Sequence, residues 1–229
     1  MKKFVTIGLG NFGMNLSKTL CENGCEVLGI DILPHIVNQA KEFMTFAMVG
    51  DATNRESLEE LSLNDYDGVI VSLGQDMAPS ILITLYLKEL QVSNIIVRAV
   101  SEDHAKILSM IGATNIVFPE KDMAARIAIR LAMKNVLDYL PIGDDYGILE
   151  ILPPSSFLNK NLKDLEIRPR FNCHVLGIKY YSEEISSELY LGKEEKFVIA
   201  PPAEQVIDDK SILIIVGKYE DIERLKNIK

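Results

Sequence analysis

The sequence predicts an α/β protein in which a doubly wound parallel sheet, with strand order 3-2-1-4-5-6, is followed by a small α+β domain. Three observations predict this fold class. Strand-like and helix-like segments alternate six times up to about residue 118. A glycine-rich turn joins the first strand to the first helix, and shorter strands replace the regular alternation beyond residue 146. We therefore expect a Rossmann domain over 1–140, a linker over 141–146 and a C-terminal domain over 147–229.

The glycine turn is Gly8-Leu9-Gly10-Asn11-Phe12-Gly13, between an apolar run and a helical pattern. Gly8 lets the chain leave the strand in a tight turn, and Gly10 lacks the Cβ that would block a phosphate. Gly13 lets the helix pack close to the strand, and the helix N-terminus attracts an anion. The segment predicts a nucleotide site, whereas the alternative is a Rossmann fold whose site has decayed.

Asp31 completes this unit at the end of the second apolar run, eighteen residues after Gly13. An acidic side chain at this place can accept hydrogen bonds from ribose hydroxyls. It would repel a 2′-phosphate, so Asp31 favours NAD(H), ATP or ADP over NADP and argues against a decayed site.

Three later strands also end in residues suited to ligand binding, at the edge where open α/β sheets bind ligands. Asp51 follows the third strand and either recognises the adenine amino group or belongs to a turn. Arg98 follows the fifth strand and either pairs with a ligand phosphate or bridges to Glu120. Ser72-Leu73-Gly74 follows the fourth strand.

The remaining elements follow from the apolar periodicity. A helix over 123–140 carries apolar residues along one side, and it packs either on a second subunit or on its own sheet. Pro141 to Asp145 is a polar break and the natural domain boundary. In the C-terminal domain we expect strands at 147–152, 174–179, 197–200 and 211–216, with helical pieces at 162–167 and 219–228.

Composition limits the partners. The 229 residues carry a formal net charge of −9, so no basic field exists for a nucleic-acid backbone. No stretch approaches the roughly 20 apolar residues that cross a bilayer, and Met1-Lys2-Lys3 runs directly into a strand without a signal peptide. We expect a cytoplasmic protein with three reduced cysteines.

No constellation for chemistry is visible. The three histidines lack partners at dyad or metal-ligand spacing, no tyrosine has a lysine four residues later, and no P-loop lysine motif occurs. A nucleotide sensor is the favoured interpretation. A small NAD-dependent oxidoreductase is the alternative, and a nucleotide-responsive repressor would need a basic module that the sequence lacks.

Several motifs together resemble one family. The chain is similar to the RCK (KTN) domains, TrkA-N plus TrkA-C, of cytosolic regulatory subunits in Ktr/Trk-type potassium uptake systems. The likeness covers nearly the whole chain, with the C-terminal part from about Asp145 resembling TrkA-C. The motifs are Gly8 to Gly13, Asp31, Gly50-Asp51-Ala52-Thr53, Ser72-Leu73-Gly74, Arg98-Ala99 and Phe118-Pro119-Glu120-Lys121-Asp122-Met123.

The resemblance implies a non-enzymatic gating subunit, attached peripherally to the inner face of the membrane through a potassium-translocating partner. It implies homodimers, formed through the helix over 123–140, that assemble into an octameric ring. Asp31 would hold ribose, Asp51-Ala52 adenine, and Glu120 would lie near the phosphates at the subunit junction, where a divalent or monovalent cation binds in some members. The full set implied for an adenine nucleotide (ATP/ADP or NAD/NADH) is Gly8, Gly10, Asn11, Phe12, Gly13, Asp31, Ile32, Asp51, Ala52, Ser72, Leu73, Gly74, Arg98 and Glu120.

Two departures from the family pattern stand out. Many Ktr members carry an arginine in the glycine turn that reaches a γ-phosphate, and this chain has Asn11. ATP as sole activator is therefore disfavoured, and NAD(H) or ADP stay open. Asp208-Asp209-Lys210 replaces the usual Gly-Asp turn before the last strand.

Overall fold

The structure is a computed structural model that describes residues 1–74, 76–133, 135–143, 145–181 and 194–226. The chain divides into two compact units, Met1–Lys121 and Asp122–Lys229. Residues 134 and 144, within the predicted helix and linker, and 227 and 228 of the predicted last helix lie outside the described residues.

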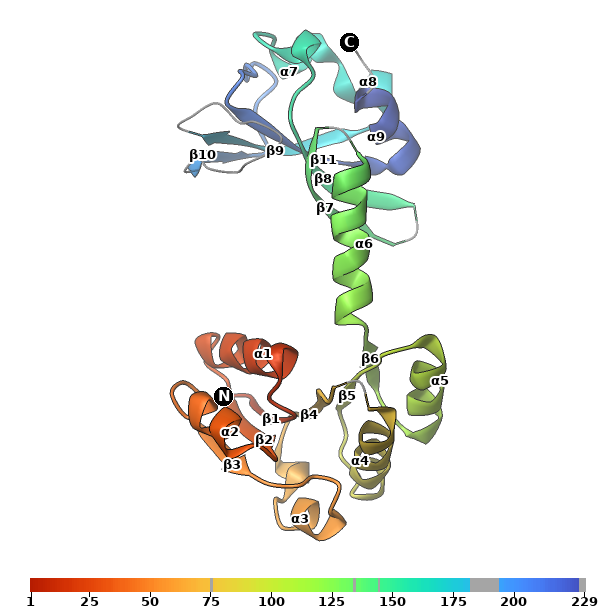
Figure 1. Ribbon diagram of the computed structural model, residues 1–229. Helices are drawn as coiled ribbons and strands as arrows, with labels where there is room; N and C mark the ends of the chain where they lie inside the picture. The colour runs from red at the N-terminus through yellow and green to blue at the C-terminus, as the bar shows by residue number, and fades with distance from the viewer. Residues whose placement is uncertain (75, 134, 144, 182–193, 227–229) are drawn as a thin grey trace. The chain divides into compact units, whose positions relative to one another are not determined.

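The first unit is built on a six-stranded sheet in the order β3-β2-β1-β4-β5-β6 (Figure 1). All its strand pairs are parallel, so the predicted doubly wound topology is confirmed. The central strand β4 is buried along its whole length, which explains its unbroken apolar sequence. The strands are β1 (Lys3–Ile7), β2 (Glu26–Asp31), β3 (Phe46–Val49), β4 (Gly68–Val71), β5 (Ile95–Arg98) and β6 (Asn115–Val117).

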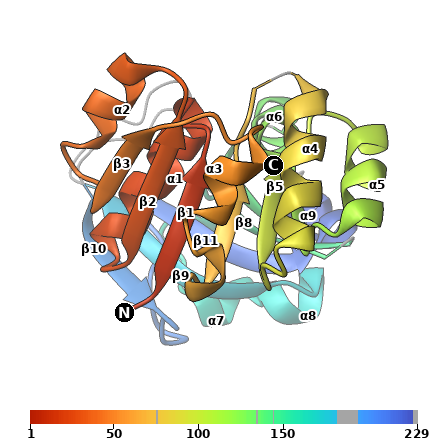
Figure 2. The same cartoon turned by 90° about the horizontal axis from the view of Figure 1, so that it is seen from below.

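Helices cover both faces of this sheet, with α1 on one face and α4 on the other (Figures 1 and 2). The Ser101 hydroxyl caps α5 by accepting a hydrogen bond from the His104 N–H. The Asn54 side chain caps α3 by accepting a hydrogen bond from the Glu56 N–H. The elements are α1 (Asn11–Glu22), α2 (Pro34–Ala40), α3 (Arg55–Glu59), the short 3-10 helix η1 (Leu63–Asp65), α4 (Met77–Glu89) and α5 (Glu102–Ile111).

The helix predicted over 123–140 is wrong at both ends. Helix α6 covers Pro119–Ala132, and Val136–Ile142 forms strand β7 instead. Asn135 has a φ of 65°, a left-handed conformation that asparagine tolerates and that cannot continue a helix. Val136, Leu137 and Tyr139 then enter the core of the second unit.

The predicted linker over 141–146 is also wrong, because the described residues of this range belong to a hairpin. Strand β7 pairs antiparallel with β8 (Tyr146–Ile151), and Ile142 lies opposite Tyr146. Gly143 takes a φ of 69° in the connection, which suits glycine. The polar composition therefore marks a turn inside a sheet.

The second unit contains a five-stranded sheet in the order β10-β9-β11-β8-β7, with antiparallel pairing throughout. The four strands predicted there are present, and β7 is the additional one. In the hydrophobic core of the second unit, short helices pack on the sheet through residues such as Phe157, Leu165 and Ile222. The other elements are the 3-10 helix η2 (Ser155–Phe157), α7 (Leu162–Leu165), α8 (Ile167–Phe171), β9 (His174–Tyr181), β10 (Glu194–Ile199), β11 (Ser211–Lys218) and α9 (Tyr219–Lys226).

Within the described parts of the chain, every helix is too short or too polar to cross a bilayer.

Candidate functional site

The three glycines of the first turn have different surroundings. Gly8 has a φ of 88°, and a Cβ there would lie 2.6 Å from the Ser72 carbonyl oxygen. A Cβ on Gly13 would lie 2.1 Å from the Gly8 carbonyl oxygen, which is an outright clash. At Gly10 the same atom would meet nothing within 4 Å. Gly8 and Gly13 are therefore required by the fold, whereas Gly10 faces open space that an incoming group can enter.

The N-terminus of α1 opens beside Gly10. Gly10 is the N-cap residue, so among the described residues the first turn has no side-chain cap. Asn11 is exposed there. Backbone N–H groups at the start of a helix are unpaired within the helix and carry the positive end of its dipole. This corner can bind an anion such as a phosphate.

Asp31 contacts the turn directly. Its Oδ2 accepts a hydrogen bond from the Leu9 N–H at 2.7 Å, and its Oδ1 accepts one from the Leu33 N–H at 2.9 Å. The residue is half-buried at the end of β2. Each carboxylate oxygen can accept more than one hydrogen bond, so Asp31 keeps capacity for a ribose hydroxyl.

Asp51 lies after β3 and is exposed. Its Oδ1 accepts hydrogen bonds from the Thr53 hydroxyl at 2.6 Å and from the Thr53 N–H at 2.9 Å. The hydroxyl is the larger of the two causes that lower the pKa of Asp51. The carboxylate is therefore an ionised acceptor, with Oδ2 suited to an amino group of a ligand.

These groups line one pocket of about 380 Å³, within the range of about 300–1,000 Å³ typical of small-molecule sites. It contains seven of the residues implicated by sequence: Gly8, Asp31, Ile32, Asp51, Ala52, Leu73 and Gly74. Asp76, Pro79 and Ile83 also line it, from the start of α4 and the residue before it. The signal that could have found Asp76 and Pro79 is their place in the segment after β4, at the carboxyl edge of the sheet.

Ser72 lies beneath the turn, outside the pocket lining. It is buried, and its hydroxyl has no hydrogen-bond partner among the described residues. A Cβ on Gly13 would come within 3.1 Å of this hydroxyl. The predicted role of Ser72 in the site therefore rests on its position under the glycine turn.

Arg98 and Glu120 come together as an ion pair. Arg98 Nη2 lies 2.5 Å from Glu120 Oε1, and Arg98 Nη1 donates to the Leu73 carbonyl oxygen at 3.2 Å. The Arg98 side chain is 17% exposed, whereas that of Glu120 is 64% exposed. The ion pair with Glu120, one of the two alternatives predicted for Arg98, is therefore formed. Arg98 thus connects Leu73, which lines the pocket, to the first turn of α6.

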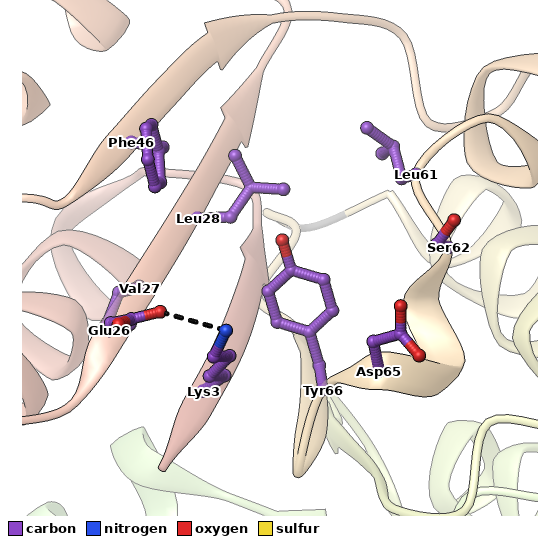
Figure 3. Close-up of a pocket in the computed structure, with 9 residues that line it drawn as sticks. All are labelled: Lys3, Glu26, Val27, Leu28, Phe46, Leu61, Ser62, Asp65 and Tyr66. Carbon is purple, nitrogen blue, oxygen red and sulfur yellow. Dashed lines mark ion pairs between the residues drawn. The ribbon is translucent and has the colours of Figure 1, made fainter. Parts of the chain in front are cut away.

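The same unit has another pocket, at the opposite edge of the sheet (Figure 3). It measures about 280 Å³ and is flanked by Phe46 and Tyr66. Lys3, the first residue of β1, and Glu26, the first residue of β2, form an ion pair beside it, with Lys3 Nζ 3.4 Å from Glu26 Oε2. Its lining includes neither a glycine turn nor the N-terminus of an α-helix, and Ser62 there begins only the short 3-10 helix η1. The pocket at the carboxyl edge is therefore the candidate nucleotide site.

Known proteins relate to this chain over its whole length. The model of the TrkA-N domain matches residues 4–119. The chain belongs to the TrkA-N family. Ktr system potassium uptake protein C of Bacillus subtilis is 40% identical over 98% of this chain and 96% of that protein. Ktr system potassium uptake protein A of Vibrio alginolyticus is 33% identical over 99% and 98% respectively.

Solved structures agree on the fold. A structure described as the GsuK channel bound to NAD has a TM-score of 0.62 and 16% identity, and the match covers 98% of this chain and 38% of that one. The GsuK RCK domain gives a TM-score of 0.52 at 19% identity, over 97% and 45%. The chain thus spans less than half of either structure, and at these identities the likeness concerns the fold alone. The predicted resemblance to RCK proteins is confirmed.

Membership of the TrkA-N family leaves the roles of individual residues as predictions. Gly10, Asn11, Phe12 and Gly13 form the turn and first turn of α1 rather than the lining of the pocket. For Glu120, the described residues hold no cluster of three or more potential metal ligands within this chain. A cation there would need ligands from a bound nucleotide or a second copy.

Proposed function

We propose that this chain is a nucleotide-sensing regulatory subunit of a potassium uptake system, acting by binding rather than by catalysis on a separate membrane subunit. The observation that carries the proposal is the carboxyl-edge pocket, with Asp31 fixing the glycine turn, in a chain whose full-length relatives are Ktr potassium uptake proteins. A membrane partner is inferred because those relatives are named as parts of a Ktr system.

An adenine nucleotide matches the groups around this pocket. Ribose hydroxyls would donate to Asp31, and the adenine amino group would donate to Asp51. The phosphates would then lie over Gly10 at the N-terminus of α1, where a Cβ would meet nothing within 4 Å. Asp31, Asp51 and Asp76 all line the pocket, so a ligand with a 2′-phosphate is disfavoured by charge.

Arg98 and Glu120 would respond to the ligand charge. A phosphate near Leu73 would compete with Glu120 for the Arg98 guanidinium, because Arg98 already donates to the Leu73 carbonyl oxygen. Glu120 is mostly exposed and would then be available to a cation shared with the phosphates. Nucleotide binding would in this way change the contacts of the first turn of α6.

Helix α6 is the proposed dimer contact. Met123, Ile127 and Leu131 are four residues apart and 50%, 47% and 80% exposed, and no residue of α6 is buried within the described chain. A stripe of this kind on one helix face suits a two-fold contact with a second copy. On α5, Ile107 and Met110 are 41% and 87% exposed, so a second apolar surface is available for the contacts that would build a ring.

Ligands act on such an assembly only if they bind its shapes unequally. A near-complete switch needs roughly 10⁴-fold discrimination between two shapes. We propose that the phosphates, at the junction of Arg98, Glu120 and a neighbouring copy, provide that difference. Solution scattering of the assembly with ATP and with ADP should give distinguishable curves, and identical curves would exclude this mechanism.

The direct test is calorimetric titration of the nucleotide-stripped chain with ATP, ADP, NADH and NADPH. We expect micromolar or tighter binding of at least one adenine nucleotide and much weaker binding of NADPH. In parallel, a bacterial strain without its own potassium uptake would express a Ktr-type membrane subunit with and without this chain. Growth on limiting potassium that is the same in both cases, or no nucleotide binding, would overturn the proposed function.

A further inference from the structure

His104 is a buried titratable residue that plays no part in the proposed ligand contacts. It lies in α5, is 1% exposed, and its Nε2 is 2.8 Å from the Ser80 hydroxyl of α4. Its Nδ1 accepts a hydrogen bond from the Val100 N–H at 3.3 Å. Helices α4 and α5 lie side by side in both views (Figures 1 and 2), so this imidazole bridges the two helices.

The contacts determine which ring nitrogen carries the proton. The Val100 N–H can only donate, so Nδ1 must be its acceptor and the proton lies on Nε2. Ser80 donates its hydroxyl to the Met77 carbonyl oxygen at 3.0 Å and can accept from Nε2–H. All groups in this chain of hydrogen bonds are satisfied when the imidazole is neutral.

The residues at the two ends of this series of hydrogen bonds lie next to the nucleotide pocket. On the α4 side, Pro79 and Ile83, neighbours of Ser80, line the pocket. On the other side, Val100 follows the strand end that carries Arg98, which contacts Leu73 and Glu120. The imidazole therefore holds one wall of the pocket at a fixed distance from the segment proposed to contact phosphate.

A second proton on Nδ1 would break this arrangement, because Nδ1–H and the Val100 N–H would face each other as two donors. In the part of the chain that the structure describes, no charged side chain offsets this effect, and burial, the sole cause of the shift, lowers the pKa of His104. The first-turn residues Glu102 and Asp103 are exposed. The other charged residues on the packed elements are Asp76, Lys88 and Glu89 at the ends of α4, Lys106 on α5, and Arg98 at the end of β5.

We propose that His104 is a positioning residue whose neutral imidazole ties α4 to the Arg98 segment, so that protonation of His104 loosens the pocket and weakens binding of adenine nucleotides. The inference rests on the proposed function for its ligand. It adds to nucleotide sensing a dependence on acidity, built from Ser80, His104 and Val100.

The test compares the full-length chain with H104Q and with the double variant H35Q/H174Q. Glutamine keeps an amide donor toward Ser80 but takes up no proton in this range. His35 and His174 are the two remaining histidines, and both are exposed. Dissociation constants for the tightest-binding nucleotide would be measured from about pH 8 to about pH 4.5, a range that extends well below the ordinary imidazole pKa because burial lowers that of His104.

We expect binding by the wild type and by H35Q/H174Q to weaken with acidification at least about fivefold more than binding by H104Q. The ionisation of the ligand itself cancels in this comparison. Parallel profiles for all three proteins would overturn the inference while leaving the proposed function intact. Absence of nucleotide binding at every pH would instead overturn the proposed function.

A second measurement covers the case in which H104Q does not fold. In H35Q/H174Q the single imidazole can be titrated by NMR with and without nucleotide. Because coupling between two ligands is reciprocal, a nucleotide that prefers the neutral imidazole must lower its pKa, by about one pH unit for each tenfold preference. An imidazole pKa that saturating nucleotide leaves unchanged would exclude the proposed coupling.

Discussion

The carboxylate of Asp31 holds the glycine turn through its hydrogen bond to the Leu9 N–H, at 2.7 Å. The acid that sequence assigns to a ribose is therefore also a structural part of the loop proposed to hold phosphates. Leu9 is only 1% exposed, and it lies between Gly8, which lines the pocket, and Gly10, which is exposed. Ribose and phosphate recognition are in this way linked through one side chain.

Asp31→Ala should lower both stability and nucleotide affinity. It leaves the Leu9 and Leu33 amides without their acceptor, at a cost of about 1–3 kcal/mol in unfolding free energy. Asp51→Ala is the matched control, since the exposed Asp51 carboxylate bonds only Thr53 among the described residues. It should weaken binding with little loss of stability. Urea unfolding and calorimetry measure both, and equal stability of the two variants would contradict the structural role of Asp31.

Gly10→Ala and Gly13→Ala should separate binding from folding. The methyl group added at Gly10 enters open space at a φ of −62°, so we expect unfolding free energy to change by less than about 1 kcal/mol while nucleotide binding is lost. The Gly13 variant drives a Cβ against the Gly8 carbonyl and should be strongly destabilised. A stable Gly13→Ala protein, or a Gly10→Ala protein with unchanged affinity, would refute the assigned roles.

The first unit could be predicted well because its pattern is local. Parallel strands buried on both faces give unbroken apolar runs such as that of β4, and the glycine turn with Asp31 is recognisable in the sequence itself. The segment after β4 marks Asp76 and Pro79 as neighbours of the carboxyl edge, but the contribution of Ile83, well inside α4, could not be predicted, because it depends on how α4 approaches the sheet.

The end of the predicted helix over 123–140 was harder to predict. The apolar side of the predicted helix over 123–140 continues through Val136 and Leu137, which fit a helix or a strand equally well. The left-handed conformation of Asn135 decides between them, and so does pairing with β8, which lies later in the chain. Likewise, the hydrogen bond between His104 and Ser80 joins two separate helices, so it could not be predicted from the spacing of these residues in the sequence.

Charged substitutions on α6 and α5 should act on different assembly steps. Ile127→Glu places a charge on the proposed dimer face and should yield monomers in light scattering. Met110→Glu lies on α5 and should allow dimers while preventing larger assemblies. Both positions are exposed, so each change should alter unfolding free energy of the single chain by less than about 0.5 kcal/mol. Unchanged oligomers in both variants would exclude these surfaces as contacts.

Alkaline pH should destabilise the second unit through Cys173. Burial, the largest cause, raises the pKa of this thiol to about 11. The thiol ionises near pH 8.5 in the unfolded chain but only near pH 11 in the folded chain. Its contribution to the stability of the folded state is therefore complete below about pH 8.5 and is lost as the pH rises toward about 11. The unfolding free energy of the wild type should therefore fall more steeply in this window than that of Cys173→Ala. Parallel curves would show that other groups dominate the alkaline response, such as Tyr180 of β9, whose pKa burial also raises.

Arg98→Ala and Glu120→Gln should change nucleotide affinity in opposite directions. Loss of the guanidinium removes the proposed phosphate contact and should weaken binding by about tenfold or more. Loss of the Glu120 charge frees Arg98 from its ion pair and should tighten binding when no divalent cation is present. Added Mg²⁺ should strengthen binding by the wild type and have less effect on Glu120→Gln.

The control for this pair is Glu102→Gln, which makes the same charge change at an exposed carboxylate paired with Lys121. Calorimetry with and without Mg²⁺ on the three variants separates a local exchange of partners from a general charge effect. Tighter binding in both glutamine variants would indicate a general effect of net charge. Weaker binding in Glu120→Gln without Mg²⁺ would mean that the ion pair with Glu120 holds Arg98 in position for the phosphate, and competition between them would be excluded.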